Sequence, residues 1–211
     1  MSNPSDRPII LAALTAFFVT LALVMPIVRV WYMTRRFPLV AHRTPDPVAR
    51  AAQFGVGVQL VGVILWTVAL VVLGPDPLGV WRVPRWTPML GAGMLGAGLL
   101  AVVLAQFQMG GSWRVGIDSR PTELVNQGMF RVVRNPIYAG VLCMLAGLVC
   151  SAPSPWTVGF LVNTALLLSV EVRLEEAHLA KIHGKTYRSY AAKVGRFLPG
   201  LGKLSPPAGN A

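Results

Sequence analysis

The stretch PMLGAGMLGAGLLAVVLAQFQM, at residues 88–109, decides the fold class, because no charged side chain interrupts it from end to end. A helix needs about 20 predominantly apolar residues to cross a hydrocarbon core of about 30 Å. This stretch is long enough, and the apolar stretches at residues 9–33 and 52–73 are long enough too. We therefore predict three membrane-spanning helices within residues 1–109.

Two shorter apolar stretches follow in the second half of the chain, at residues 137–150 and 156–170, joined by the turn sequence SAPSP. Neither is comfortably long enough to span a bilayer alone. The sequence leaves open whether they form two full spans or a partial hairpin. We predict an all-α, polytopic integral membrane protein with about five transmembrane helices.

The composition of the chain agrees with a bilayer environment. Only 13% of the 211 residues are charged and 54% are hydrophobic, and the mean hydropathy is +0.58. A soluble domain usually carries about a quarter charged residues. The net charge of +11, from 19 Lys and Arg against 8 Asp and Glu, is compatible with nucleic-acid binding as well as with a membrane protein.

The placement of the basic residues favours the membrane. With five crossings and the amino terminus outside, the connection at 34–50, the polar loop at 110–136 and the tail after Glu171 lie on one face. Most of the Lys and Arg fall in these three segments, whereas the opposite face receives Arg7, Arg82 and Arg85. The positive-inside rule then predicts a multi-pass protein of the inner or plasma membrane with a cytoplasmic carboxyl terminus, and no nucleic-acid partner.

The residues suited to chemistry concentrate in the second half of the chain. The polar segment at 110–136 is too long for a simple connector, and a second cluster of polar residues lies at 171–190. We predict three parts: N-terminal transmembrane helices at 1–109, a core with a helical hairpin and C-terminal helices at 110–199, and a flexible tail at 200–211.

Two local patterns identify candidate site residues. Asn135-Pro136 predicts a helix start, because Asn can cap and Pro is tolerated at the first helical position; the free amides of such a start bind carboxylates. Glu171, Glu175 and His178 share one helical face, while Glu176 is turned away by about 100°. A carboxylate near the membrane face is costly without a partner, so Glu171 and Glu175 are functional candidates.

These segments resemble the isoprenylcysteine carboxyl methyltransferase and phospholipid methyltransferase superfamily. The resemblance extends over about residues 110–199 and depends on the order and spacing of several short motifs. The matching residues are Leu124-Val125, Gly128, Phe130, Arg134-Asn135-Pro136-Ile137-Tyr138-Ala139-Gly140, Glu175-Glu176, Gly184, Tyr187 and Arg196-Phe197-Leu198-Pro199.

The resemblance implies methyl transfer from S-adenosylmethionine to a lipophilic or lipidated acceptor, with membrane lipids as further partners. It also implies that the part at 110–199 is a cofactor-binding core that forms a cytoplasmic cofactor pocket. A metal site is not expected, because the chain has only three His as candidate ligands beside its carboxylates. Glu171 and Arg134 are the candidate catalytic residues. The positions that the resemblance assigns to cofactor binding are Asp118, Thr122, Glu123, Leu124, Val125, Phe130, Asn135, Pro136, Ile137, Tyr138 and Glu175.

Two departures from the family pattern bear on the chemistry. Asn135 stands where well-known members have His, so a binding role remains but an acid–base role does not. Glu171 stands where prenylcysteine enzymes carry an arginine that contacts the substrate. A carboxylate there would repel an acceptor carboxylate, which argues against carboxyl methylation.

Other interpretations of the sequence remain. An NADPH-dependent reductase of the steroid-reductase type and a non-catalytic membrane scaffold are the alternative functions. The GxGxxG pattern at 91–96 lies inside a predicted span, so we interpret it as helix packing through small residues rather than as a dinucleotide site. The acceptor remains open among a prenylated thiol, an amine head group, a quinone-like ring and a small volatile thiol, as does the oligomeric state.

Overall fold

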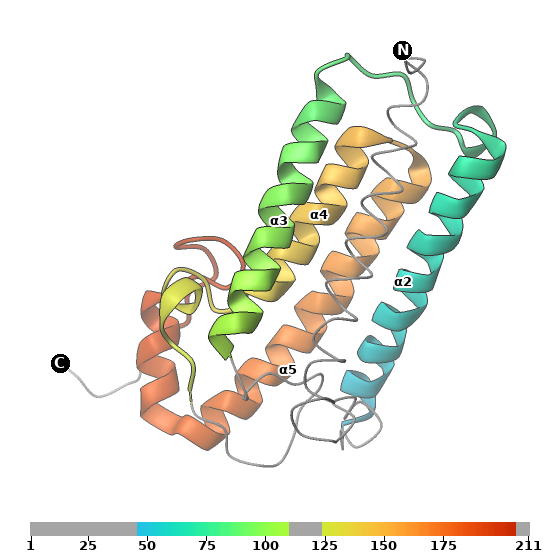
Figure 1. Ribbon diagram of the computed structural model, residues 1–211. Helices are drawn as coiled ribbons and strands as arrows, with labels where there is room; N and C mark the ends of the chain where they lie inside the picture. Colours follow the sequence, from blue (N-terminus) through green and yellow to red (C-terminus); the bar gives the residue numbers. More distant parts are fainter. Residues whose placement is uncertain (1–45, 110–123, 206–211) are drawn as a thin grey trace.

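The protein was analysed as a computed structural model, which describes residues 46–109 and 124–205. The predicted first span at 9–33 lies outside these ranges, and so do the predicted cofactor residues Asp118, Thr122 and Glu123. Every regular element in the described ranges is helical (Figure 1). The predicted all-α fold class is therefore confirmed.

Four long helices form the described structure. They are α2 (Pro47–Leu73), α3 (Thr87–Met109), α4 (Pro136–Ser151) and α5 (Pro155–Lys193). Two short 3-10 helices, η2 (Asp76–Leu78) and η4 (Gly128–Arg131), lie in the connections. Helices α2, α3 and α5 are long and apolar enough to cross a membrane, whereas α4 is shorter.

Helix α2 begins earlier than the sequence predicts. The Asp46 side chain caps it, with Oδ1 accepting hydrogen bonds from the amides of Val48 at 2.7 Å and Ala49 at 3.3 Å. This cap satisfies amides that the first helical turn leaves free. As a result Arg50, predicted to lie in the connection, belongs to the helix.

Helices α4 and α5 form a hairpin with arms of unequal length. The turn between them is fixed by a capping box, in which Ser154 and Thr157 exchange hydrogen bonds, and by the Trp81 amide, which donates to the Pro153 carbonyl at 2.8 Å. The 16 residues of α4 extend about 24 Å, and the 29 residues of α5 that precede its bend at Gly184 extend about 44 Å. The second arm thus continues as one helix well past residue 170, into the charged segment.

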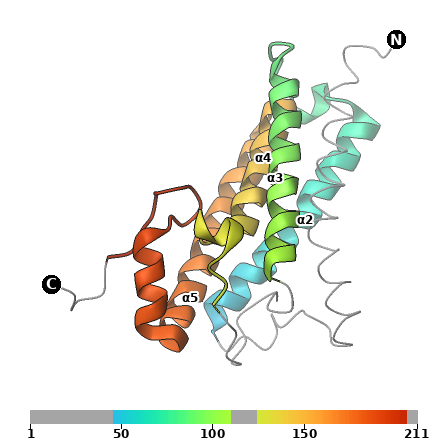
Figure 2. The same cartoon turned by 60° about the vertical axis from the view of Figure 1, so that its left-hand side comes forward.

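The four helices lie side by side in one bundle (Figures 1 and 2), and α3 packs most closely on α4. A Cβ atom added at Gly98 would lie 2.5 Å from the Gly140 carbonyl oxygen, and one at Gly91 would lie 2.5 Å from that of Gly147. Outside the backbone of α3 itself, no atom of the described residues lies within 4 Å of a Cβ at Gly93 or Gly96. Small-residue packing is confirmed for Gly91 and Gly98, which face α4, whereas Gly93 and Gly96 make no such contact with the described residues.

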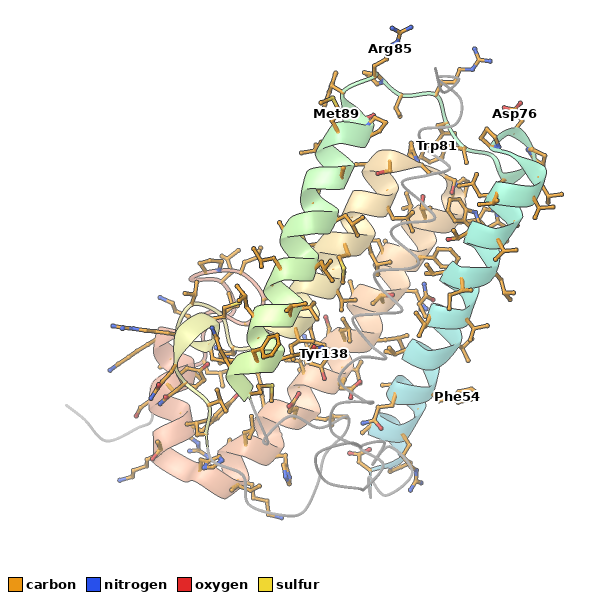
Figure 3. The ribbon with its side chains drawn as sticks, in the orientation of Figure 1. Phe54, Asp76, Trp81, Arg85, Met89 and Tyr138 are labelled. Atoms are coloured by element: carbon orange, nitrogen blue, oxygen red, sulfur yellow. The ribbon has the colours of Figure 1, made fainter. Side chains whose placement is uncertain are left out.

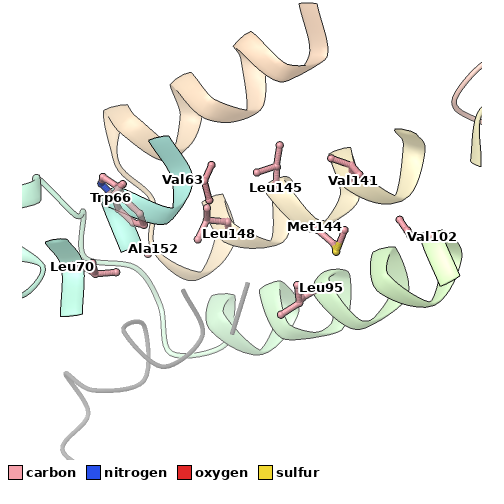
Figure 4. Close-up of a cluster of buried hydrophobic side chains, with 10 residues drawn as sticks. All are labelled: Val63, Trp66, Leu70, Leu95, Val102, Val141, Met144, Leu145, Leu148 and Ala152. Atoms are coloured by element: carbon pink, nitrogen blue, oxygen red, sulfur yellow. The ribbon is translucent and has the colours of Figure 1, made fainter. Parts of the chain in front are cut away.

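A single apolar cluster fills the interior between the helices (Figure 4). The outer faces are also apolar: Phe54, Leu65 and Val72 of α2 are each more than half exposed. A soluble protein rarely exposes such a surface, whereas a bilayer favours it. The cluster comprises Val63, Trp66, Leu70, Leu95, Val102, Val141, Met144, Leu145, Leu148 and Ala152.

Helix α5 bends sharply at Gly184, whose φ of 54° and ψ of −124° are non-helical. Glycine adopts this conformation readily because it has no Cβ. The remaining turns of α5 fold back beside the helix, and the chain then returns toward the start of α4 (Figures 1 and 2). The bend therefore brings the carboxyl-terminal segment against η4 and α4.

Candidate functional site

The candidate site lies at the end of the bundle where α4 begins, near Tyr138 (Figure 3). Glu171 of α5 is 7% exposed, and its Oε1 accepts a hydrogen bond of 3.1 Å from Nε2 of Gln53 on α2. The Gln53 Oε1 atom is buried and has no partner among the described residues. Thus α2 contributes a polar side chain to the site.

Glu175 lies one helical turn beyond Glu171 and is half-buried. It forms no ion pair within the described part of the chain. The Tyr138 hydroxyl lies within electrostatic range of both carboxylates. Two like charges this close in a partly desolvated place repel each other. A cationic ligand or a proton would relieve that repulsion.

Glu176 has a different environment from its two neighbours. Its Oε1 accepts hydrogen bonds from Arg134, at 3.0 Å from Nε and 2.7 Å from Nη2, and its Oε2 pairs with Nη2 of Arg196 at 2.7 Å. Both the Glu176 carboxylate and the Arg134 guanidinium are buried. Hydrogen bonding to Glu176 raises the pKa of Arg196. Two arginines thus neutralise Glu176, whereas none of the described basic side chains forms an ion pair with Glu175.

The start of α4 is where the sequence predicts it, but its cap differs. Asn135 occupies the N-cap position, yet its side chain makes no capping hydrogen bond. Instead its Nδ2 donates to the Arg196 carbonyl at 3.3 Å. The predicted capping by the Asn135 side chain is therefore wrong: its Nδ2 is directed at the Arg196 carbonyl, and its Oδ1 accepts no hydrogen bond from the first turn of α4. The Asn135 side chain thus leaves the amides of Ile137 and Tyr138 uncapped, and no other described side chain is seen to cap them.

Phe130 is buried in η4, and its carbonyl accepts a 2.5 Å hydrogen bond from the Tyr190 hydroxyl. Burial raises the pKa of Tyr190 to about 12 against a smaller lowering effect of Arg134, so this hydroxyl remains a donor at neutral pH. The Gln108 side chain accepts from the Met129 amide at 2.7 Å. The η4 segment is thereby held from both α3 and the carboxyl-terminal turns of α5.

The structure brings together most of the predicted site residues that it describes. Phe130, Arg134, Asn135, Pro136, Ile137 and Tyr138 follow one another into α4, with the half-buried Leu124 and Val125 just before η4, and Glu171 and Glu175 lie within electrostatic range of Tyr138.

Sequence reasoning did not assign a role to Gln53, Glu176 or Arg196, and for Tyr190 it favoured a structural role over a catalytic one. Glu176 and Arg196 were visible as parts of motifs. Gln53 was visible as a polar side chain within a predicted span.

Comparison with known proteins agrees with the motif analysis. Residues 86–186, just under half of the chain, match the model of the phospholipid methyltransferase family. No curated protein matches the chain. The matched segment runs from the start of α3 to just past Gly184, and it includes Tyr138, Glu171 and Glu175. The chain is an integral membrane protein whose resemblance to the membrane methyltransferase superfamily is confirmed over residues 86–186, which match the phospholipid methyltransferase family.

Proposed function

We propose that this protein transfers a methyl group from S-adenosylmethionine to a lipophilic acceptor that reaches the site from the bilayer. The observation that carries the proposal is the family match over residues 86–186, the segment in which Tyr138, Glu171 and Glu175 gather. We further propose that this end of the bundle faces the cytoplasm, because basic residues concentrate in the tail beyond Glu171.

The groups around the start of α4 suit the amino-acid part of S-adenosylmethionine. The uncapped amides of Ile137 and Tyr138 are donors at the positive end of a helix, where a carboxylate binds favourably. The unpaired Glu175 would take the ammonium group, which relieves its repulsion with Glu171. When bound, the cofactor supplies a methyl group already activated on a cationic sulfur, so the chain itself needs no metal.

In this proposal Glu171 and Gln53 receive the acceptor. The Glu171 carboxylate and the unpartnered Oε1 of Gln53 both accept hydrogen bonds, so an acceptor with a polar hydrogen, or with a positive charge, is favoured over a carboxylate. The cofactor would supply its methyl carbon to the acceptor's lone pair, and the electron pair of the carbon–sulfur bond would stay on sulfur, so that S-adenosylhomocysteine would be the leaving group. Any proton that the acceptor loses would pass to Glu171. The protein's main contribution is to align the two partners and exclude water.

Ligand titration tests this function directly. The full-length protein in detergent, titrated by calorimetry with S-adenosylhomocysteine and separately with NADPH, is expected to bind the first and not the second. Glu175→Gln should weaken the binding of S-adenosylhomocysteine roughly tenfold to a hundredfold, because a charge-assisted hydrogen bond is lost.

Asp76→Asn is the matched control, because Asp76 is an exposed carboxylate at the opposite end of the bundle (Figure 3). Its affinity for S-adenosylhomocysteine should equal that of the wild type. Binding of NADPH alone would favour a reductase of the steroid-reductase type instead. Binding of neither ligand would favour a non-catalytic membrane protein.

A further inference from the structure

The buried Glu176 joins two arginines that are far apart in the sequence. The Arg134 side chain is 2% exposed and that of Arg196 is 21% exposed. Arg134 uses all of its N–H groups inside the protein: Nε and Nη2 donate to Glu176, Nη2 also to the Gly202 carbonyl, and Nη1 to the carbonyls of Ala191 and Val194. No N–H of Arg134 is left for a substrate.

The backbone on either side of these arginines is joined as well. Val133 and Gly195 form a parallel β-bridge. The Arg134 amide donates to the Gly195 carbonyl at 2.8 Å, and the Asn135 amide donates to the Arg196 carbonyl at 3.1 Å. Backbone hydrogen bonds therefore connect residues 133–135, which lead into α4, to residues 195–196, which follow α5.

Hydrogen bonds also define the conformation of the segment after α5, at residues 194–204. The Arg196 amide donates to the Leu201 carbonyl at 2.7 Å, and the Leu204 amide donates to the Ala191 carbonyl at 3.0 Å. A Cβ atom at the buried Gly195 would overlap the Leu198 carbonyl oxygen. This loop therefore has internal bonds of its own, which a passive connector would lack.

We propose that Arg196, acting through Glu176 and Arg134, is a positioning residue that fixes Phe130 and Asn135 in the candidate site. Arg196 lies beyond the matched family segment, so the site extends into the carboxyl-terminal loop. Arg134 acts through the same cluster and has a positioning role in place of the catalytic one predicted from the sequence. The effect on ligand binding rests on the proposed function. The contacts between the carboxyl-terminal loop and the start of α4 do not depend on it.

Arg196→Ala tests the proposal in the full-length protein, with two readouts. Hydrogen exchange without ligand should quicken at the amides of Arg134 and Asn135 but remain unchanged in α3. Calorimetry with S-adenosylhomocysteine should show affinity about tenfold weaker, within the range of coupled neighbouring residues. Arg196→Lys should fall between Arg196→Ala and the wild type in both, because lysine keeps the charge but loses the planar fork.

Arg188→Ala is the control, because Arg188 is an exposed arginine of the same carboxyl-terminal turns; it should match the wild type in both readouts. Unchanged exchange at Arg134 and Asn135 in Arg196→Ala would overturn the proposal. Faster exchange at these amides with unchanged affinity for S-adenosylhomocysteine would also overturn it, because the contacts of Arg196 would then have no effect on the candidate site. Failure of the wild type to bind S-adenosylhomocysteine would instead overturn the proposed function, and exchange would still decide whether Arg196 holds the segment.

Discussion

Three glutamates within two turns of α5 have three different sets of partners. Glu171 accepts a hydrogen bond from Gln53, Glu176 lies between Arg134 and Arg196, and Glu175 forms no ion pair within the described residues. Since a carboxylate's role depends on what neutralises it, these side chains have different chemistry despite their identical type. The ion pairs of Glu176 indicate a structural role, whereas we propose Glu171 and Glu175 as the ligand contacts.

At this scale we predict that Glu171→Gln separates turnover from cofactor binding. The amide keeps the shape of the side chain but cannot take a proton. Transfer of labelled methyl from S-adenosylmethionine into a membrane lipid extract should fall about a hundredfold. Affinity for S-adenosylhomocysteine by calorimetry should stay within about twofold of the wild type. A larger change would indicate that the substitution removes a contact with this ligand.

Asp76→Asn again serves as the control and should transfer methyl groups at the wild-type rate. Wild-type transfer by Glu171→Gln would remove Glu171 from the reaction. A large loss of S-adenosylhomocysteine affinity would instead assign Glu171 to the cofactor.

At the scale of helices, glycine position decides how closely two elements approach. Gly91 and Gly98 are seven residues apart and lie on the face of α3 that meets α4, whereas Gly93 lies on another face. Helices in membranes gain their contact energy largely through such close packing of small residues. The close packing of α3 on α4 therefore helps to fix the position of the first turn of α4 and its uncapped amides.

We predict that Gly98→Ala destabilises the protein and that Gly93→Ala does not. A Cβ at Gly98 would lie 2.5 Å from the Gly140 oxygen and 2.8 Å from Cγ of Met144, so α3 and α4 must separate. The cost should be about 1–3 kcal/mol, as for other overpacked interiors. At Gly93, alanine should be neutral or stabilise by up to about 1 kcal/mol through helix propensity. Thermal unfolding in detergent measures both, and equal midpoints would contradict the packing.

For the whole molecule, the two ends of the helix bundle differ in their interfacial and charged side chains. The loop between α2 and α3 carries Arg82 and Arg85 with the exposed Trp81 and Trp86. The bend at Gly184 and the basic turns after it lie at the opposite end of the bundle (Figure 1). Interfacial tryptophans at one end and basic residues at the other are typical of a membrane protein with a fixed orientation.

Orientation can be measured by cysteine labelling of intact cells. In a background with Cys143 and Cys150 replaced by alanine, Arg85→Cys should react with a membrane-impermeant maleimide. Lys193→Cys should react only after permeabilisation, because the positive-inside rule places its segment in the cytoplasm. The opposite labelling pattern would reverse the proposed orientation. The two positions control for each other, since both are exposed.

The sequence by itself determined the helices, because apolar length and helix-start signals are local properties. The spans predicted at 52–73 and 88–109 and the start of a helix at Pro136 agree with α2, α3 and α4 to within a few residues. The motif set also predicted the family resemblance that the comparison confirmed. The number of membrane crossings stays a prediction, because the first predicted span lies outside the described residues.

Only the tertiary structure decided which charges meet. Gln53 and Glu171 are 118 residues apart, Arg134 and Glu176 are 42 apart, and Glu176 and Arg196 are 20 apart. Helical spacing placed Glu176 away from Glu171 and Glu175, but it carried no information on what Glu176 would face. That depended on the bend at Gly184, which returns the chain to the start of α4. Which side chains form ion pairs between distant segments depends on how the helices pack, and local sequence patterns do not encode that packing.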